Sequence, residues 1–133
     1  MSHSYAAIVA GINARFATIS GLTVLDYEPT HVEPPTIYTL LDGVAFNQQG
    51  QVKETRYRLL HRLCIRWQDN ERAEQELMPY VTSIPAAVRA DPRLGGAIVS
   101  GLAAIAEVQA VFVKIGAVTY RCLDFYSDVL VKE

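Results

Sequence analysis

The side chains in this sequence that are best suited to bind a charged group are arginines at alternating positions. Residues 54–67 alternate strictly between apolar and polar side chains, as in a long β-strand with one buried face. The arginines fall on the polar face of that run: Arg56, Arg58, Arg62 and Arg66. Like charges on one face repel each other unless something of opposite charge lies against them. The pattern therefore predicts either acidic partner strands or a negatively charged ligand.

The acidic residues that could neutralise the arginines of this face lie in the last two predicted strands, and they are Glu107, Asp124 and Asp128. A guanidinium binds a carboxylate through two hydrogen bonds, which suits such a place. We predict that these acids pair with the arginines, within one subunit or across an interface between subunits. Asp124 and Asp128 share a strand face, where two carboxylates can do acid–base chemistry. The sequence places no pocket residues around them, so ion pairing is the better interpretation.

The histidines give no sign of a metal or catalytic site. His3, His31 and His61 are far apart, and none stands at a metal-ligand spacing from a cysteine. His61 and Cys64 fall on opposite faces of one predicted strand, which excludes a local Cys–His pair, and we expect His61 to be half buried. The sequence has neither a phosphate-binding loop nor a Gly-x-Ser-x-Gly elbow. We therefore expect no enzymatic activity, no cofactor and no metal.

The composition is that of one domain, residues 1–133, that assembles with copies of itself. Half of the residues are hydrophobic and 20% are charged, and the mean hydropathy is +0.14. A chain this short cannot hide so much apolar surface by itself, which favours an oligomer. The net charge of −2 argues against a dedicated nucleic-acid binder. We expect the only cysteines, Cys64 and Cys122, to be buried free thiols.

No segment of the sequence is predicted to enter a membrane. The N-terminus has no basic leader region, so we expect no signal peptide. The longest uncharged apolar run, residues 94–106, is too short to span a bilayer.

The elements that must position the charged face are two helical segments and a set of strands. Residues 4–19 predict a helix that is capped by Ser4. Residues 69–96 predict the helical segment on which the sheet packs. Asp69 starts it, Pro79 ends or kinks its first part, and Thr82 or Ser83 caps a second part. Its apolar stripe is expected to comprise Ala73, Leu77, Val81, Ile84 and Val88.

The predicted strands cover residues 22–27, 36–41, 54–67, most of 97–106, 107–115 and 118–131. Residues 28–35 hold three prolines and predict an extended connector. The fold class is therefore α+β. We expect a mixed, mostly antiparallel sheet flanked by the N-terminal helix and the central helical segment.

Two connections attract attention because of their length or composition. Asp42-Gly43 should break the second strand, and residues 43–53 predict a long polar loop, which is either a mobile surface loop or a contact with a neighbouring molecule. The loop residues singled out are Asp42, Gly43, Phe46, Asn47, Gln48, Gln49, Gly50 and Gln51. The second connection is a turn after the helical segment that needs a positive φ at one of its glycines. Its residues are Asp91, Pro92, Leu94, Gly95 and Gly96.

The order of these features resembles the tail terminator and tail completion proteins of long-tailed bacteriophages. An N-terminal helix precedes a short strand that ends in Asp26-Tyr27-Glu28-Pro29, and Pro34-Pro35 begins the next strand. A polar loop, a long strand, a helix with the turn of residues 90–96, and two strands with Tyr120 and Phe125 follow. The resemblance covers nearly the whole chain, and its most specific part is the Asp-Pro-x-Leu-Gly-Gly turn.

The resemblance implies a structural virion protein. Such proteins form a hexameric ring on the head-proximal end of the tail tube, stop tube growth, and offer a docking face for head–tail joining. The implied partners are copies of the chain, the tail tube protein and the head–tail connector, with DNA passing through the lumen without sequence-specific binding. The implied location is the virion tail, after assembly in the host cytoplasm.

Three other functions stay open at this point. A head-closure or adaptor protein of the connector has the same size and layout. A nucleic-acid-binding module could use the arginine face, although that face lacks aromatic side chains for base stacking. A small-ligand enzyme with an unrecognised site would be a monomer with a deep pocket.

Overall fold

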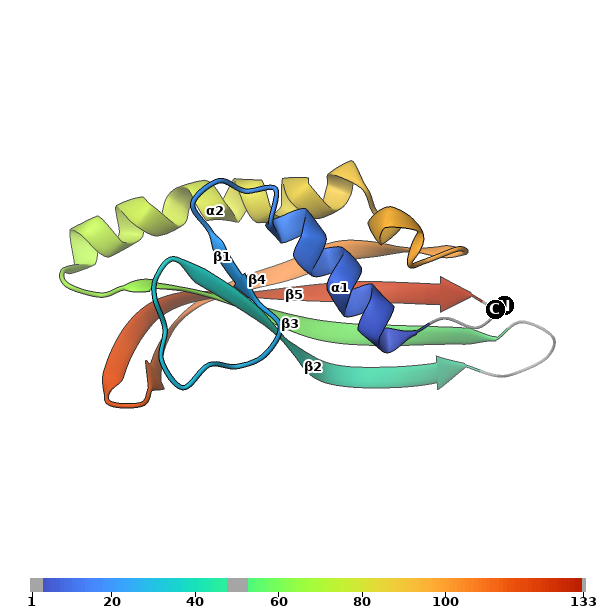
Figure 1. Cartoon of the computed structure of the whole chain (residues 1–133), viewed down its shortest axis with the longest axis horizontal. Helices are drawn as coiled ribbons and strands as arrows, with labels where there is room; N and C mark the ends of the chain where they lie inside the picture. Colours follow the sequence, from blue (N-terminus) through green and yellow to red (C-terminus); the bar gives the residue numbers. More distant parts are fainter. Residues whose placement is uncertain (1–3, 48–52, 133) are drawn as a thin grey trace.

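A computed structural model describes residues 4–47 and 53–132 as one α+β domain (Figure 1). The elements in order are α1 (Tyr5–Phe16), β1 (Thr23–Leu25), β2 (Thr36–Asn47), β3 (Glu54–Arg66), α2 (Asn70–Ala90), a 3₁₀ turn η1 (Leu94–Gly96), β4 (Gly101–Ile115) and β5 (Val118–Lys132). The five strands form one mixed sheet in the order β1-β2-β3-β5-β4. β1 runs parallel to β2, and the other neighbours are antiparallel. The predicted fold class is confirmed.

α1 begins where the sequence indicates and ends earlier. The Ser4 hydroxyl accepts a hydrogen bond from the backbone N–H of Ala7 at 3.3 Å, as an N-cap should. The predicted end at residue 19 is wrong, because the helix stops at Phe16. There the hydroxyl of Thr18 donates to the carbonyl of Arg15, so a local side-chain bond satisfies a terminal acceptor.

α2 is one continuous helix, so the predicted end at Pro79 and the second cap at Thr82 or Ser83 are wrong. Asp69 caps it as expected, because its carboxylate accepts the N–H of Arg72 at 2.8 Å. A proline removes one intrahelical hydrogen bond. Pro79 is exposed and Pro85 half buried, and the residues four positions earlier are exposed, so water can satisfy the freed carbonyls.

The face that α2 buries differs from the prediction at one position. Its buried residues are Ala73, Leu77, Ile84, Ala87 and Val88. Val81 is 44% exposed, because steps of four residues overshoot a turn of 3.6 residues and carry it off the buried face. Tyr80 packs against the core in its place.

Both helices pack on the same face of the sheet. The main core joins apolar residues of α1 and α2 to the alternate apolar residues of β3 and β5, including Leu59, Leu63, Leu123 and Phe125. The strict alternation predicted for β3 is therefore confirmed on its apolar side. A smaller cluster on the opposite face contains Val32, Tyr38, Cys64, Ile115, Tyr120 and Cys122.

The bounds of β1, β2 and β4 differ from the prediction, and β1 covers only Thr23–Leu25 of the predicted residues 22–27. β2 does not end at Leu41, because a register shift between Leu41 and Gly43 lets the strand pass Asp42 and continue to Asn47. β4 begins at Gly101, so residues 97–100 belong to the turn that precedes it. Gly101 has a φ of 124°, and a Cβ there would lie 1.9 Å from the carbonyl oxygen of Leu130. Only glycine fits this start of the strand.

Candidate functional site

The centre of the polar sheet face is an ion pair between Arg62 of β3 and Asp124 of β5. The two residues are direct register partners. Nε and one terminal nitrogen of Arg62 donate to the two carboxylate oxygens of Asp124 at 2.8 and 2.9 Å. The Arg62 side chain is 19% exposed and that of Asp124 is 5% exposed. The hydrogen bonds to Asp124 raise the pKa of Arg62, so the guanidinium stays charged.

The hydroxyl of Tyr38 lies close to this pair and is buried without a hydrogen-bond partner among the described residues. Arg62 is near it, but the guanidinium is directed at Asp124 and forms no hydrogen bond of normal geometry with the phenol. Burial raises the pKa of Tyr38. The hydroxyl is therefore neutral and contributes a desolvation penalty at this place.

Arg58 lies two pairs further along the same face and contacts several groups. Its Nε lies 3.0 Å from a carboxylate oxygen of Asp42, and a terminal nitrogen lies 3.6 Å from Glu107. The guanidinium also lies 4.7 Å from the centre of the Tyr126 ring. The Arg58 side chain is 49% exposed, so solvent screens these contacts and each stabilises the fold only weakly.

The other charged residues of the predicted set are exposed. Arg56, Arg66 and Asp128 form no ion pair within residues 4–47 and 53–132. Asp128 is the register partner of Arg58, although the latter turns to Asp42 and Glu107 instead. The structure therefore brings Arg58, Arg62, Glu107 and Asp124 into pairs within one chain.

The predicted loop is strand along its first part. Asp42, Gly43, Phe46 and Asn47 belong to β2, so the break expected at Asp42-Gly43 is wrong for the reason given above. Gln48, Gln49, Gly50 and Gln51 lie outside the described residues.

The turn after α2 has the predicted backbone. Gly95 and Gly96 have φ values of 68° and 93°, and Leu94 also has a positive φ of 55°. The Asp91 carboxylate accepts the N–H of Gly95 at 2.8 Å, and the carbonyl of Pro92 accepts the N–H of Ala103 in β4. The turn therefore ties the end of α2 to the start of β4.

Gly11 permits the close packing of α1 on this turn. A Cβ at that position would lie 2.7 Å from the carbonyl oxygen of Leu94. No local signal in the sequence reveals this long-range contact.

His61 is completely buried, so the expectation of half burial is wrong. Its Nδ1 lies 2.7 Å from Oγ1 of Thr39, and its Nε2 lies 2.7 Å from Oγ of Ser127. Oγ1 of Thr39 in turn donates to Oδ1 of Asn13 at 3.3 Å, which is consistent with a neutral ring protonated on Nδ1. Burial lowers the pKa of His61 to about 3. The hydroxyl partners are not recognisable from sequence spacing.

Cys64 and Cys122 are buried free thiols, as predicted. They are register partners on β3 and β5, and their sulfur atoms lie 3.1 Å apart. The hydrogen bond between them and burial raise the pKa of Cys122, which makes it a poor nucleophile at neutral pH.

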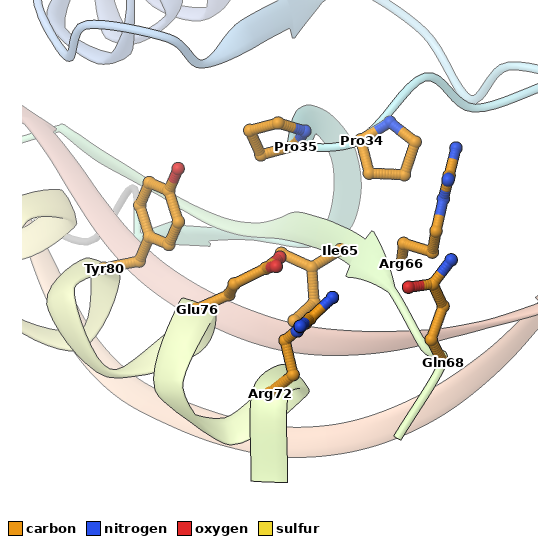
Figure 2. Close-up of a pocket in the computed structure, with 8 residues that line it drawn as sticks. All are labelled: Pro34, Pro35, Ile65, Arg66, Gln68, Arg72, Glu76 and Tyr80. Carbon is orange, nitrogen blue, oxygen red and sulfur yellow. The ribbon is translucent and has the colours of Figure 1, made fainter. Parts of the chain in front are cut away.

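A pocket of about 510 Å³ lies between the proline connector and the first half of α2 (Figure 2). Pro34 and Pro35 line one side, the end of β3 provides Ile65 and Arg66, Gln68 follows that strand, and α2 provides Arg72, Glu76 and Tyr80. Burial and the nearby Glu76 raise the pKa of Tyr80, which therefore stays a neutral phenol. The lining suits a small polar or anionic molecule and contains no nucleophile next to a base.

The described residues contain neither a metal site nor a membrane-spanning helix. No group of three His, Cys, Asp or Glu side chains within residues 4–47 and 53–132 is placed to hold a metal ion. In the same ranges, neither helix has the length and apolar character needed to cross a bilayer. Comparison with known proteins adds no assignment, because neither a protein-family model nor a curated protein matches the chain.

Proposed function

We propose that the chain is a ring-forming tail terminator of a long-tailed bacteriophage. In this proposal a ring of subunits, most simply six, caps the head-proximal end of the tail tube, stops its growth, and presents a face to the head–tail connector. DNA passes through the lumen without sequence-specific contacts.

The observation that carries the proposal is the order of elements around one sheet. A helix, a short strand, a proline-bounded strand, a long strand, a central helix, the Asp91–Gly96 turn and a final hairpin follow each other in the structure, and this is the order on which the resemblance rests. The turn, which is the most specific part of the resemblance, has its glycines at positive φ and is held by Asp91.

The pairing of the arginines favours this reading over a nucleic-acid-binding module. Arg62 is committed to a nearly buried carboxylate, and Arg58 lies against two further acids. A phosphate backbone would have to compete with those carboxylates, which also repel it. Within the described residues, Arg56, Arg66 and Lys132 remain as cations without an ion pair on that face, which is few for a surface that relies on phosphate contacts.

The test is electron microscopy of the purified protein with tail tubes assembled from the tube protein of the same genome. We expect a ring at one end of each tube, and tubes that stop growing at that end when more tube protein is added. Tubes incubated without the protein are the control. Tubes that keep growing at both ends would contradict the proposal, and binding to connectors but not to tubes would favour a head-closure or adaptor protein.

A further inference from the structure

The sheet ends in two strand edges that have no sheet partner within the described residues. β4 pairs with β5 alone, and only its beginning is covered, where the N–H of Ala103 bonds the carbonyl of Pro92. At the opposite edge, β1 pairs with only Thr36, Ile37 and Tyr38 of β2. Residues 39–46 of β2 therefore have β3 on one side, and no strand of residues 4–47 or 53–132 lies on the other. Figure 1 shows the two edges on opposite sides of the sheet.

Each edge carries only part of the usual protection against pairing with another chain. Monomeric proteins blunt exposed edges with charged side chains, prolines, β-bulges or very short strands, and here each edge strand has one bulge, at Asp42 of β2 and at Ala106 of β4. The free half of β4, residues 107–115, contains only Glu107 and Lys114 as charged residues and no proline. Residues 39–46 of β2 contain one charged residue, Asp42 at the bulge, and no proline. Away from the two bulges, the backbone donors and acceptors of both edges are available to a further strand.

The exposed apolar side chains of both edges lie on the same face of the sheet. Val44 and Phe46 of β2 are 36% and 68% exposed, and Val108 and Phe112 of β4 are 37% and 52% exposed. Their register partners on β3 and β5 show that all four are on the face that carries the helices. A strand that joins either edge therefore needs apolar side chains on the helix-covered face. The β2 edge and the β4 edge both have such side chains, so each meets the requirement of the other.

Phe112 is held in place before any partner arrives. Its ring packs edge-on against Trp67 with the ring centres 5.0 Å apart. The guanidinium of Arg121 lies 4.5 Å above it and is itself bonded to Glu74 of α2. A side chain that is already ordered loses little entropy on binding, so this exposed aromatic is suited to an interface.

We propose that the free half of β4 in one copy of the chain pairs with residues 39–46 of β2 in the next copy. β2 and β4 run in opposite directions within the sheet, so copies in the same orientation pair these edges antiparallel. Glu107 of β4 is level with Leu40 of β2, so the two free stretches meet when neighbouring copies are displaced along the strand direction. The contact joins different surfaces, which produces a closed ring when the rotation between copies closes. This inference rests on the proposed function and names the subunit interface of its ring.

The size of the contact explains why a ring is preferred to an isolated pair. Eight strand residues extend over about 27 Å, and a sheet with one helix layer is roughly 20 Å deep, which gives about 550 Å² per partner. The total of about 1,100 Å² lies at the lower limit for a specific interface. One contact alone is weak, and closing the ring adds a further contact without another loss of translational freedom.

Two lysine variants and a matched control test this contact. Phe46→Lys places a charge on the β2 edge, and Val108→Lys places one on the β4 edge. Val99→Lys alters an apolar side chain that is 59% exposed and lies outside both edges. Sedimentation velocity and native mass spectrometry follow assembly up to about 1 mM protein, a range that includes weak specific contacts. Thermal unfolding checks that each variant is folded.

We expect each edge variant to raise the concentration for half assembly at least about tenfold, and the control to behave as the wild type. A mixture of Phe46→Lys and Val108→Lys subunits should give a dimer that grows no further, because each subunit keeps one intact edge of the right kind. Wild-type protein that stays monomeric throughout overturns the inference. Normal assembly of Phe46→Lys alone would also overturn it, since β4 would then pair with another β4.

The same variants separate this inference from the proposed function. Rings that need both edges but do not stop tube growth would remove the tail-terminator assignment and leave the contact. Rings that cap tubes and tolerate both lysines would remove the contact and leave the assignment.

Discussion

Lowering the pH from 7 to 5 will destabilise the fold through His61. In the folded protein the pKa of this histidine is lowered to about 3, from an ordinary value of 6.5. At a pH between these two pKa values, the histidine of the unfolded chain binds a proton that the histidine of the folded chain does not bind. The free energy of unfolding therefore falls as the pH falls below 6.5, by about 1.4 kcal/mol per pH unit. At pH 5 the expected loss is about 2 kcal/mol.

The assay is urea unfolding at pH 5, 6 and 7, compared between the wild type and two variants. His61→Gln removes the titrating ring and keeps an amide that can bond Thr39 and Ser127, so it should lose about 2 kcal/mol less than the wild type over this range. His31→Gln, at an exposed histidine, should keep the full pH dependence. An NMR titration of His61 in the wild type gives a second readout, with no change expected above pH 5. Equal pH dependence in all three proteins, or a ring that titrates near pH 6, would refute the reasoning.

Other positions give simpler predictions. Arg62→Ala should lower the free energy of unfolding by about 3–5 kcal/mol in urea titrations, because a nearly buried carboxylate loses its partner. Asp124→Ala added to that variant should recover part of the loss, and no recovery would mean that the pair is not coupled. Gly101→Ala should destabilise the fold far more than Gly95→Ala. Gly95 has open space around it, so an alanine there costs only about 1–2 kcal/mol for its left-handed backbone conformation. Similar melting temperatures for the two variants would contradict the clash with Leu130. Tyr38→Phe should raise the free energy of unfolding by about 1 kcal/mol, because it removes an unsatisfied buried hydroxyl. A clear loss of stability in that variant would show that the hydroxyl has a partner.

The sequence allowed prediction of features that depend on local pattern. Strict alternation over residues 54–67 correctly separates Leu59 and Leu63 from Arg58 and Arg62, because side chains of a strand alternate between faces whatever the strand packs against. The pairing of Arg62 with Asp124 was predictable as a type of contact, since charges of opposite sign were available for one face. Whether that pairing would form within a chain depends on strand order, which periodicity does not encode.

Features that depend on distant contacts were missed. Asp42-Gly43 has the composition of a turn, yet pairing with β3 holds it as a bulge and carries the strand on to Asn47. Pro79 disfavours a helix locally, but the packing of α2 on the sheet outweighs one lost hydrogen bond. The burial of His61 depends on two hydroxyls that come from β2 and β5. Each of these outcomes is decided by residues far away along the chain.

The strand order also has a consequence for how the chain folds. β2 with β3, and β4 with β5, are hairpins between consecutive strands, and each can form early because the loop to be closed is short. The pairing of β3 with β5 joins residues such as Arg62 and Asp124, which are 62 positions apart, across the whole of α2. Contacts of such high sequence separation are formed late and slow the folding of a domain. We therefore expect two hairpins that form independently, and a rate-limiting step in which α2 brings them together and the central ion pair closes.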